Sequence, residues 1–249
     1  MNQIDYEAFY NEVGASNGWD FSRLKCISEE AKWDLYQEVV KLSRKTDLLL
    51  DIGTGGGEAI LSIADCALLL VGIDLSTGMV NTAMKNITKA GRGNVRVLQM
   101  NADKLDFPDR FFQTVACRHS AFNAQEVARV LENGGTFLTQ QVSEYDKLNL
   151  KQAFGRGQAY GEKPGSLKER YLLELTEAGF TKIEVMEWNV AEFYETAEDL
   201  IFLLKHTPII PNFGRQPEDF GRLEAFIRDN KSEKGIKTNA ERFMIKAQR

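Results

Sequence analysis

A glycine-rich turn between two acidic residues is the feature of this sequence best suited to chemistry. The segment Asp51-Ile52-Gly53-Thr54-Gly55-Gly56-Gly57-Glu58 follows an apolar run at residues 47–52 and precedes a helical pattern. Glycines let a backbone approach a ligand closely, and open α/β sheets bind ligands at such strand ends. About twenty residues later a second apolar run ends in Asp74, whose carboxylate suits the hydroxyl pair of a ribose. The pattern therefore predicts a nucleoside site.

The residues around the turn discriminate among nucleoside ligands. A phosphate-binding P-loop ends in Gly-Lys-Ser/Thr, whereas this turn continues with Glu58-Ala59, so that class is excluded. In a dinucleotide fingerprint Glu58 would occupy the third glycine position, and together with Asp51 it would set negative charge against a pyrophosphate. A ligand with cationic groups is favoured instead. S-adenosylmethionine fits, because it carries adenosine, an ammonium and a sulfonium but no phosphate.

Four motifs, in order between about residues 47 and 142, resemble class I S-adenosylmethionine-dependent methyltransferases. Residues 51–57 match the Asp/Glu-x-Gly-x-Gly-x-Gly motif, and residues 72–79 look like the second motif of the family. Residues 101–112 resemble the third, with its Phe-Pro-Asp turn, and residues 126–135 are similar to the Glu-x-x-Arg-Val-Leu-x-x-Gly-Gly helix. The small-molecule and quinone-type branch is the most similar. The chain departs from the family pattern at Asn101, where Asp is frequent, and at Asn133, where Pro is usual.

The resemblance implies a role for each matched position. Asp51 and the backbone at Gly53 would hold the methionine ammonium, and Asp74 would bind the ribose diol. Leu75 and Met79 would flank adenine, with the Ala102 N–H on its ring, and residues 117–118 would line the methionine end. The expected cofactor contacts are Asp51, Gly53, Thr54, Gly55, Gly57, Asp74, Leu75, Met79, Asn101, Ala102, Asp103, Cys117, Arg118 and, from the N-terminal segment, Tyr10.

Methyl transfer from a sulfonium is an in-line displacement, so the protein mainly supplies proximity and alignment. A general base is needed only for a protonated acceptor. His119, just past the fourth expected strand, is the candidate catalytic base; the alternative is a structural or acceptor-shaping contact. His206 is a weaker candidate, with a cation at a helix end as the alternative. Gln140 and Gln141 suit either a polar acceptor or a loop backbone, and Cys117 suits a small buried position.

Alternation of apolar runs and helical patterns predicts a doubly wound, mostly parallel, Rossmann-like α/β sheet. Strands are expected at residues 47–52, 67–73, 95–100, 113–117, 136–142, 181–188 and 242–247. The resemblance implies a seven-stranded sheet whose last strand is antiparallel. Residues 151–165 and 229–241 are expected to be loops. The whole chain, residues 1–249, is expected to be one domain, with a helical arm at 1–45, a core at 46–191 and 241–249, and a helical insertion at 192–240.

Two segments outside the motifs are open to more than one interpretation. The N-terminal aromatic residues either pack as core or close over the cofactor as a lid, with Tyr10 favoured on the sulfonium through cation–π attraction; the residues are Tyr6, Phe9, Tyr10 and the run 17–21. The insertion at 192–240 suits a cap over an acceptor pocket, a dimer contact or plain packing. The sequence does not choose between a monomer and a homodimer.

Composition excludes several classes of protein. The 249 residues are 43% hydrophobic and 27% charged, which is typical of a globular chain, and the net charge of −5 argues against a nucleic-acid partner. Apolar runs are too short to span a membrane, and no signal peptide is evident. Three scattered cysteines and two histidines argue against a metal centre or disulfide framework and favour a cytoplasmic protein.

The sequence thus predicts an S-adenosylmethionine-dependent methyltransferase acting on a small-molecule acceptor. One alternative is a non-catalytic protein that binds S-adenosylmethionine or another nucleoside. Another is an RNA methyltransferase, which is less favoured because Cys117-Arg118-His119-Ser120 stands where an Asn-Pro-Pro-Tyr-type motif would follow the fourth strand.

Overall fold

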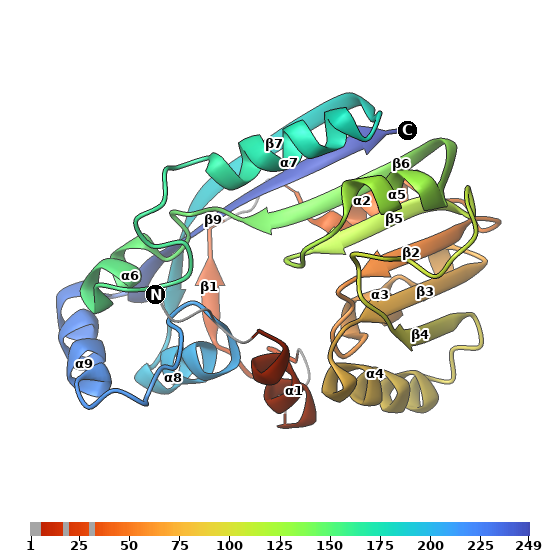
Figure 1. Cartoon of the computed structure of the whole chain (residues 1–249). Coiled ribbons are helices and arrows are strands. Elements are labelled where there is room, and N and C mark those ends of the chain that lie inside the picture. Colours follow the sequence, from red (N-terminus) through yellow and green to blue (C-terminus); the bar gives the residue numbers. More distant parts are fainter. Residues whose placement is uncertain (1–5, 17–19, 30–32) are drawn as a thin grey trace.

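The computed structural model describes residues 6–16, 20–29 and 33–249, and the side chains from residue 8 onward within those ranges (Figure 1). The elements in chain order are α1 (Tyr6–Ser16), β1 (Cys26–Ser28), α2 (Leu35–Leu42), β2 (Leu48–Ile52), α3 (Glu58–Ser62), the 3-10 turn η1 (Ala64–Cys66), β3 (Leu69–Asp74), α4 (Thr77–Ala90), β4 (Val95–Gln99), β5 (Phe112–Arg118), α5 (Ala124–Val130), β6 (Leu131–Val142), α6 (Leu148–Phe154), α7 (Ser166–Glu177), β7 (Thr181–Tyr194), α8 (Ala197–His206), α9 (Asp219–Asn230), β8 (Lys231–Ser232) and β9 (Gly235–Gln248). No helix in these ranges is long and apolar enough to cross a membrane.

Within the described residues the strands form one nine-stranded sheet in the order β1-β7-β9-β6-β5-β2-β3-β4, with β8 paired to β9. β4, β3, β2, β5 and β6 are parallel neighbours, whereas β9 runs antiparallel to both β6 and β7. The predicted doubly wound, mostly parallel α/β fold with an antiparallel last strand is confirmed. The seven expected strands are present, and the short strands β1 and β8 are additional.

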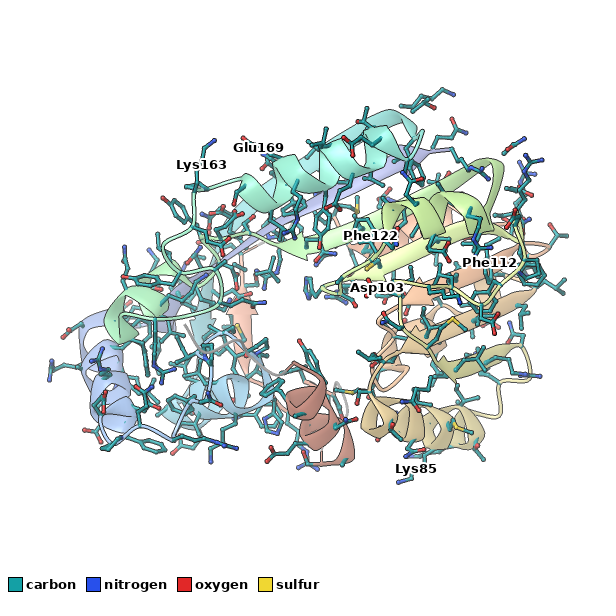
Figure 2. The ribbon with its side chains drawn as sticks, viewed as in Figure 1. Lys85, Asp103, Phe112, Phe122, Lys163 and Glu169 are labelled. Carbon is teal, nitrogen blue, oxygen red and sulfur yellow. The ribbon has the colours of Figure 1, made fainter. Side chains whose placement is uncertain are left out.

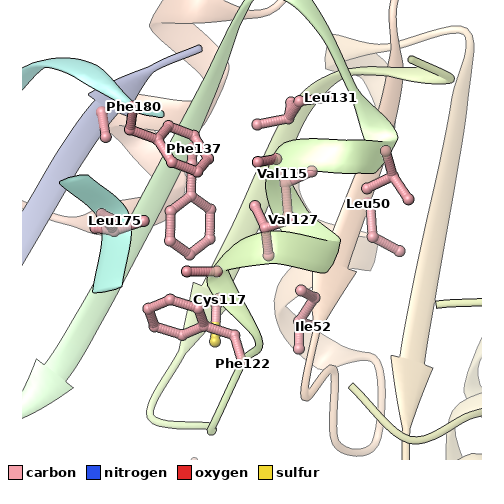
Figure 3. Packing of buried hydrophobic residues seen from close by; sticks show 14 of the residues in the cluster. Leu50, Ile52, Val115, Cys117, Phe122, Val127, Leu131, Phe137, Leu175 and Phe180 are labelled. Carbon is pink, nitrogen blue, oxygen red and sulfur yellow. The ribbon is translucent and has the colours of Figure 1, made fainter. Parts of the chain in front are cut away.

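Alternating side chains of the central strands explain why helices cover both faces of the sheet. Leu50 and Ile52 of β2 pack into one hydrophobic cluster, with α5, α7 and the rings of Phe122 and Phe137 (Figure 3). Leu49, between them in the chain, packs into a second cluster with α2, α3 and α4. Successive residues of a strand face opposite sides. A strand buried on both sides therefore carries a nearly continuous apolar run, as residues 48–52 do.

The edge of the sheet carries a group of elements that we call the side lobe: α6, α8, α9, β1, β8 and the outer ends of β7 and β9. Figure 1 shows α6, α8, α9 and β1 on the side of β9 away from the parallel strands, and β8 pairs with the start of β9. They share their own hydrophobic cluster, formed by Leu150, Phe154, Tyr194, Leu200, Leu203, Leu204, Ile209, Ile210, Phe213, Leu223, Phe226 and Ile236. The helical segments of the predicted insertion are thus packed together on an apolar interior.

The loop predicted at residues 229–241 is wrong, and the loop predicted at 151–165 is wrong in its first four residues. β7 and β9 each span 14 residues, and their paired outer ends run through residues 189–194 and 236–241, most of which were expected to lie in the insertion or a loop. Lys151–Phe154, expected to be loop, is the end of α6. The hydrophobic pattern that would predict the start of β9 is weak, because the buried residues there are mostly small or polar. Ile236, Thr238 and Ala240 alternate with charged or amide side chains.

The N-terminal helix α1 packs tightly across the start of α4. A Cβ atom at Gly78 would lie 2.5 Å from the Asn11 carbonyl oxygen, and one at Gly14 would lie 2.5 Å from the Met79 nitrogen. The Asn11 Oδ1 atom accepts hydrogen bonds from Ser76 Oγ at 2.9 Å and from the Gly78 N–H at 3.3 Å. The absence of a side chain at Gly14 and Gly78 therefore lets α1 pack directly against the start of α4, beside the loop that follows Asp74.

Gly78→Ala is expected to displace α1, because the new methyl group meets backbone rather than a flexible side chain. Overpacking of this kind destabilises by about 1–3 kcal/mol. Hydrogen exchange measured by mass spectrometry should become faster in residues 8–16, and the melting temperature should fall by several degrees. The matched control is Gly221→Ala in α9, where a Cβ meets nothing within 4 Å. Equal exchange in both variants would contradict the tight contact.

Candidate active site

The glycine turn lies where three parallel strands end together. β2 pairs with β3 on one side and β5 on the other, so Ile52 lies beside Ile73 and Cys117. The N–H groups of Gly53 and Thr54 both donate to the Ile73 carbonyl, at 2.9 and 3.0 Å. Gly53 has φ of 73°, and a Cβ there would lie 2.3 Å from the Ser120 Cβ. The turn thus needs glycine and is held against the loop after β5.

Asp51 is a buried carboxylate with one open oxygen. Its Oδ1 atom accepts a hydrogen bond from Tyr36 Oη at 3.1 Å, whereas Oδ2 has no partner among the described residues. Burial raises the pKa of Asp51 to about 7, although nearby hydroxyls and the charge of Arg118 partly offset the effect. A buried carboxylate left open in this way fits a cationic ligand group, because burying a charge unpaired is unfavourable. The contact of Asp51 with a methionine ammonium stays a prediction.

Asp74 ends β3 and joins the turn to the neighbouring loop. Its Oδ2 atom accepts from the Gly55 N–H at 2.9 Å, and its Oδ1 atom accepts from the Ser76 N–H at 2.9 Å. Burial raises the pKa of Asp74, and the backbone donors at Ser76 and Gly55 oppose that rise. An ionised carboxylate has about four lone-pair sites, so two remain for hydroxyl groups. The geometry fits a ribose diol as well as holding the turn.

The residues expected around adenine follow the ends of β3 and β4. The Met100 N–H donates to the Asp74 carbonyl at 3.0 Å, which sets the loop 101–103 beside Asp74. Figure 2 shows Asp103 at the edge of the core that faces the side lobe, whereas Lys85 points away on α4. Leu75 is 45% exposed, as a ring contact requires. The expected contacts at Leu75, Asn101, Ala102 and Asp103 stay predictions.

Two of these positions also have structural roles. Met79 is fully buried in the first turn of α4, so its side chain packs beneath the residues that line the site. The Asn101 Oδ1 atom accepts from the Asp103 N–H at 2.9 Å, and this closes the loop locally. Asn101 can therefore serve the turn and, through a second lone pair, a ligand amino group.

Cys117 is a small buried residue next to the turn. It packs in the cluster of Figure 3, and its thiol donates to the Ser120 carbonyl at 3.2 Å. Burial, and then the charge of Asp51, raises the pKa of the thiol to about 12. A thiol held neutral in this way is a poor nucleophile. Gln141 also donates to the Ser120 carbonyl, at 2.8 Å, so it binds the loop backbone.

His119 lies at the ligand edge in a left-handed conformation, with φ of 55°. Its N–H donates to the Gln140 carbonyl at 2.8 Å, and its Nε2 atom lies 3.0 Å from the amide nitrogen of Gln140, which can only donate. Burial, and then the charges of Arg242, Arg118 and Lys147, lowers the pKa of His119 well below its usual range. The imidazole is therefore neutral at physiological pH, with Nε2 as an acceptor.

A cavity of about 380 Å³ opens beside His119, between the sheet edge and the side lobe. Its wall is made by Ser28, Trp33, Asp34, Gln37, Arg118, His119, Gln140, Trp188, Glu192, Ala240 and Arg242. The rings of Trp33 and Trp188 meet edge to face with centroids 4.0 Å apart. This volume lies within the range of small-molecule sites. The predicted methionine-end residue Arg118 is thus on the wall of the cavity as well as near Asp51.

A buried charge network forms the lobe side of this cavity. Lys147 Nζ lies 2.5 Å from Glu192 Oε2, which also accepts from Tyr194 Oη at 2.9 Å. Arg242 pairs with Asp146, and both groups are nearly buried. Opposite charges that satisfy one another can be buried together, whereas removing one partner is strongly destabilising. The network therefore fixes the lobe against the sheet at the cavity.

The remaining predicted residues lie elsewhere. Tyr10 is half-buried on α1 beside Phe9, with ring centroids 5.2 Å apart. Residues 17–19 of the aromatic cluster lie outside the described residues, so its role as a lid stays a prediction. His206 ends α8 in the side lobe, where Nδ1 lies 2.7 Å from the Phe202 carbonyl oxygen. His206 thus lies at a helix end, and its role stays a prediction.

The residues that sequence reasoning missed come from distant segments. Tyr36 reaches Asp51 from α2, and Trp188 and Arg242 reach the cavity from β7 and β9. Tyr36 belongs to none of the four motifs, so no sequence signal assigned it to the site. The pairing of Trp188 with Arg242 depends on the register of two strands far apart in the chain.

Comparison with known proteins identifies the central part of the chain. Residues 49–135 match the model of the methyltransferase domain family. Over 97 residues the chain is 36% identical to the uncharacterized methyltransferase YcgJ of Bacillus subtilis, a match covering 36% of this chain and 38% of YcgJ. The ubiquinone/menaquinone biosynthesis C-methyltransferase UbiE of Francisella philomiragia is 29% identical over 130 residues, 43% of this chain and 51% of UbiE. These matches thus span about half or less of the relatives.

Solved structures agree on the fold over most of the chain. The structure of YcgJ from Bacillus subtilis has a TM-score of 0.59 at 22% identity and covers 86% of this chain and 97% of that one. An N-methyltransferase of Haemonchus contortus, in complex with phosphomonomethylethanolamine and S-adenosylhomocysteine, has a TM-score of 0.54 at 19% identity and covers 88% and 53%. The domain match and this shared fold agree with the motifs at residues 51–57, 72–79, 101–112 and 126–135. Residues 49–135 therefore match a methyltransferase domain, and the motifs and fold around them are those of the class I, S-adenosylmethionine-dependent type.

Proposed function

We propose that this protein transfers a methyl group from S-adenosylmethionine, by in-line displacement, to a small-molecule acceptor in the cavity beside His119. The observation that carries the proposal is the open, buried Oδ2 atom of Asp51, next to a glycine turn and near the wall of that cavity. The named relatives support methyl transfer, and the S-adenosylhomocysteine complex of a structural neighbour supports the cofactor.

In this proposal each end of the cofactor has its own residues. Asp51 accepts from the methionine ammonium, and Asp74 accepts from the ribose hydroxyls while it holds the Gly55 turn. Leu75 and the loop 101–103 flank the adenine. When bound, S-adenosylmethionine supplies a methyl group that is already activated by the sulfonium, so the acceptor needs mainly alignment. The cavity supplies that alignment from both the sheet edge and the side lobe.

The cavity also separates an enzyme from a non-catalytic binding protein. A protein that only binds the cofactor needs the glycine turn and Asp74. It has no use for a second space of about 380 Å³ with polar side chains at the methionine end. We therefore favour the enzyme over the binding protein.

His119 acts in this proposal by shaping the acceptor site. Because burial and three cations lower the pKa of the imidazole, the ring is held in its neutral form and accepts from Gln140. His119→Ala is expected to lower turnover about tenfold or more, in line with the loss of one positioned group, while S-adenosylhomocysteine binding by calorimetry changes little. At saturating S-adenosylmethionine, where the titration of Asp51 no longer limits cofactor binding, the pH profile of turnover should lack a histidine limb near pH 6.5. Equal loss of turnover and cofactor affinity would instead place His119 in the cofactor site.

A thermal-shift series tests the cofactor first. S-adenosylmethionine and S-adenosylhomocysteine at a hundred times their dissociation constants should stabilise the protein by about 2.7 kcal/mol. For a chain of this size the midpoint should rise by roughly 5–10 °C. NAD and NADP are the controls, and a rise with those alone would overturn the proposal. A screen of small acceptors, read as S-adenosylhomocysteine release, then tests transfer itself.

A further inference from the structure

We infer that the methyl acceptor is a small anionic molecule whose oxyanion, such as a carboxylate, pairs with Arg118. The inference rests on the proposed function and names the substrate class of the same cavity. It depends on which charges of the cavity wall are already paired, on the polarity of that wall and on its size.

Of the two arginines in the wall, Arg118 is the one that forms no ion pair with a described residue. The other, Arg242, pairs with Asp146, and the nearby Lys147 pairs with Glu192. Within the described part of the chain, no hydrogen bond or ion pair engages the Arg118 guanidinium, which lies 5.8 Å from the centroid of the Tyr36 ring. Arg presents several donors in a fork that matches a carboxylate. An acceptor with such a group would satisfy these donors.

The acidic residues of the wall are already engaged. Glu192 accepts from Lys147 and from the Tyr194 hydroxyl. Asp34 caps α2, where its Oδ1 atom accepts from the Gln37 N–H at 3.0 Å, and the helix N-terminus favours that negative charge. The open Oδ2 atom of Asp51 is needed by the cofactor ammonium. No acid of the wall is therefore left to pair with Arg118, so its charge is available to a ligand oxyanion, and the probe experiment below separates an acceptor from the carboxylate of the cofactor.

A second unpartnered donor occurs on the same wall. The indole N–H of Trp188 is buried without an acceptor among the described residues. An unpaired buried donor is unfavourable and rare in native proteins. Arg118 and Trp188 together give the wall a surplus of donors, which suits a ligand rich in acceptor oxygens.

The polarity and size of the cavity narrow the class further. Apart from Ala240 and the two tryptophans, the lining side chains are polar or charged. A volume of about 380 Å³ corresponds to about a dozen water molecules at roughly 30 Å³ each. Such a space fits a compact polar acceptor, with one flat group against the tryptophans, better than one with a long aliphatic chain.

Binding of two matched probes tests the inference without knowledge of the natural acceptor. Benzoate and benzamide have nearly the same shape, but only benzoate carries a charge. Their affinities would be measured by calorimetry or ligand-detected NMR on protein saturated with S-adenosylhomocysteine. We expect benzoate to bind at least about tenfold more tightly than benzamide, as a hydrogen-bonded charge predicts. Equal affinity of the two probes, or no binding of benzoate, would overturn the inference.

Variants of Arg118 test whether the preference for benzoate over benzamide depends on this residue. Arg118→Gln should reduce the benzoate-to-benzamide ratio to below about threefold, whereas Arg118→Lys, which keeps the charge, should retain most of it. Trp188→Phe, which removes the N–H but keeps a ring, should weaken benzoate more than benzamide. An Arg118→Gln ratio like that of the natural protein would refute the assignment, as would loss of S-adenosylhomocysteine affinity alone. Failure of S-adenosylhomocysteine to bind the natural protein would count against the proposed function instead.

Discussion

At pH 8 the Asp51→Asn variant is expected to bind S-adenosylhomocysteine at least about a hundredfold more weakly than the natural protein. Breaking a buried pair of charges by removing one partner costs about 3–5 kcal/mol, because the other charge stays buried and unpaired. The substituted amide would keep the hydrogen bond from Tyr36 Oη but present no charge to the ammonium. Calorimetry gives the two affinities directly, and Asp65→Asn, at an exposed acid paired with Arg92, is the control.

The same carboxyl predicts how affinity depends on pH. Because the pKa of Asp51 is raised to about 7, the group is mostly protonated at pH 6 and charged at pH 8. A ligand that needs the carboxylate should therefore bind about tenfold more weakly at pH 6 than at pH 8. Asp51→Asn should show a flat profile. A flat profile in the natural protein, with unchanged affinity in the variant, would remove Asp51 from the cofactor site.

Asp51 should make the cofactor-free protein less stable as the pH rises, whereas it makes cofactor affinity rise. The folded state binds the Asp51 proton more tightly than the unfolded chain, whose carboxyl has a pKa near 3.8. The contribution of this group to stability therefore falls as pH rises from about 4 to 7. In the absence of cofactor, Asp51→Asn should melt at a higher temperature than the natural protein at pH 8, although it binds the cofactor less well.

Asp74→Ala is expected to lower S-adenosylhomocysteine affinity by about two orders of magnitude, because hydrogen bonds to a charged group contribute about 1.5–3 kcal/mol each. The variant should also melt several degrees lower, since the Gly55 and Ser76 N–H groups lose their acceptor. Calorimetry and thermal melting measure the two effects. Asp106→Ala, at an exposed acid outside the site, is the control.

A ribose contact also predicts a change in selectivity. The natural protein should prefer adenosine to 2′,3′-dideoxyadenosine in competition with S-adenosylhomocysteine, and Asp74→Ala should lose that preference. If the variant kept both its affinity and its selectivity, the acid would serve only to hold the turn.

Much of the parallel core could be predicted because its signals are local. β2 and β3 are short apolar runs that end in a glycine turn and in Asp74, and the run itself indicates burial on both faces. The cofactor residues follow from their places at these strand ends, because parallel strands bring their carboxyl ends to one edge. Neither the burial of these strands nor the placement of the cofactor residues depends on contacts between residues that are distant in sequence.

The residues around the acceptor cavity are brought together by contacts between distant parts of the chain, and no local sequence pattern predicts such contacts. The pKa of His119 falls first because the ring is buried, and then because Arg242, Arg118 and Lys147 lie near it. Of these three cations, Arg242 and Lys147 are more than twenty residues away in sequence. Sequence alone suggested an ordinary histidine that titrates near neutral pH. Similarly, the contact of Tyr36 with Asp51 crosses from a helix to a strand, and its geometry is set only by packing.

The long pairing of β7 with β9 makes the shape of the acceptor site a matter of strand register. Trp188 and Glu192 of β7, and Ala240 and Arg242 of β9, are separated by even numbers of residues, so each pair projects from one face of its strand onto the cavity. Inserting one residue before Trp188 would turn that face outward, whereas inserting two would shift it by about 6–7 Å and keep it inward. A lineage with this scaffold could thus exchange acceptors through paired, even-numbered length changes in two strands, without altering the residues proposed to bind the cofactor.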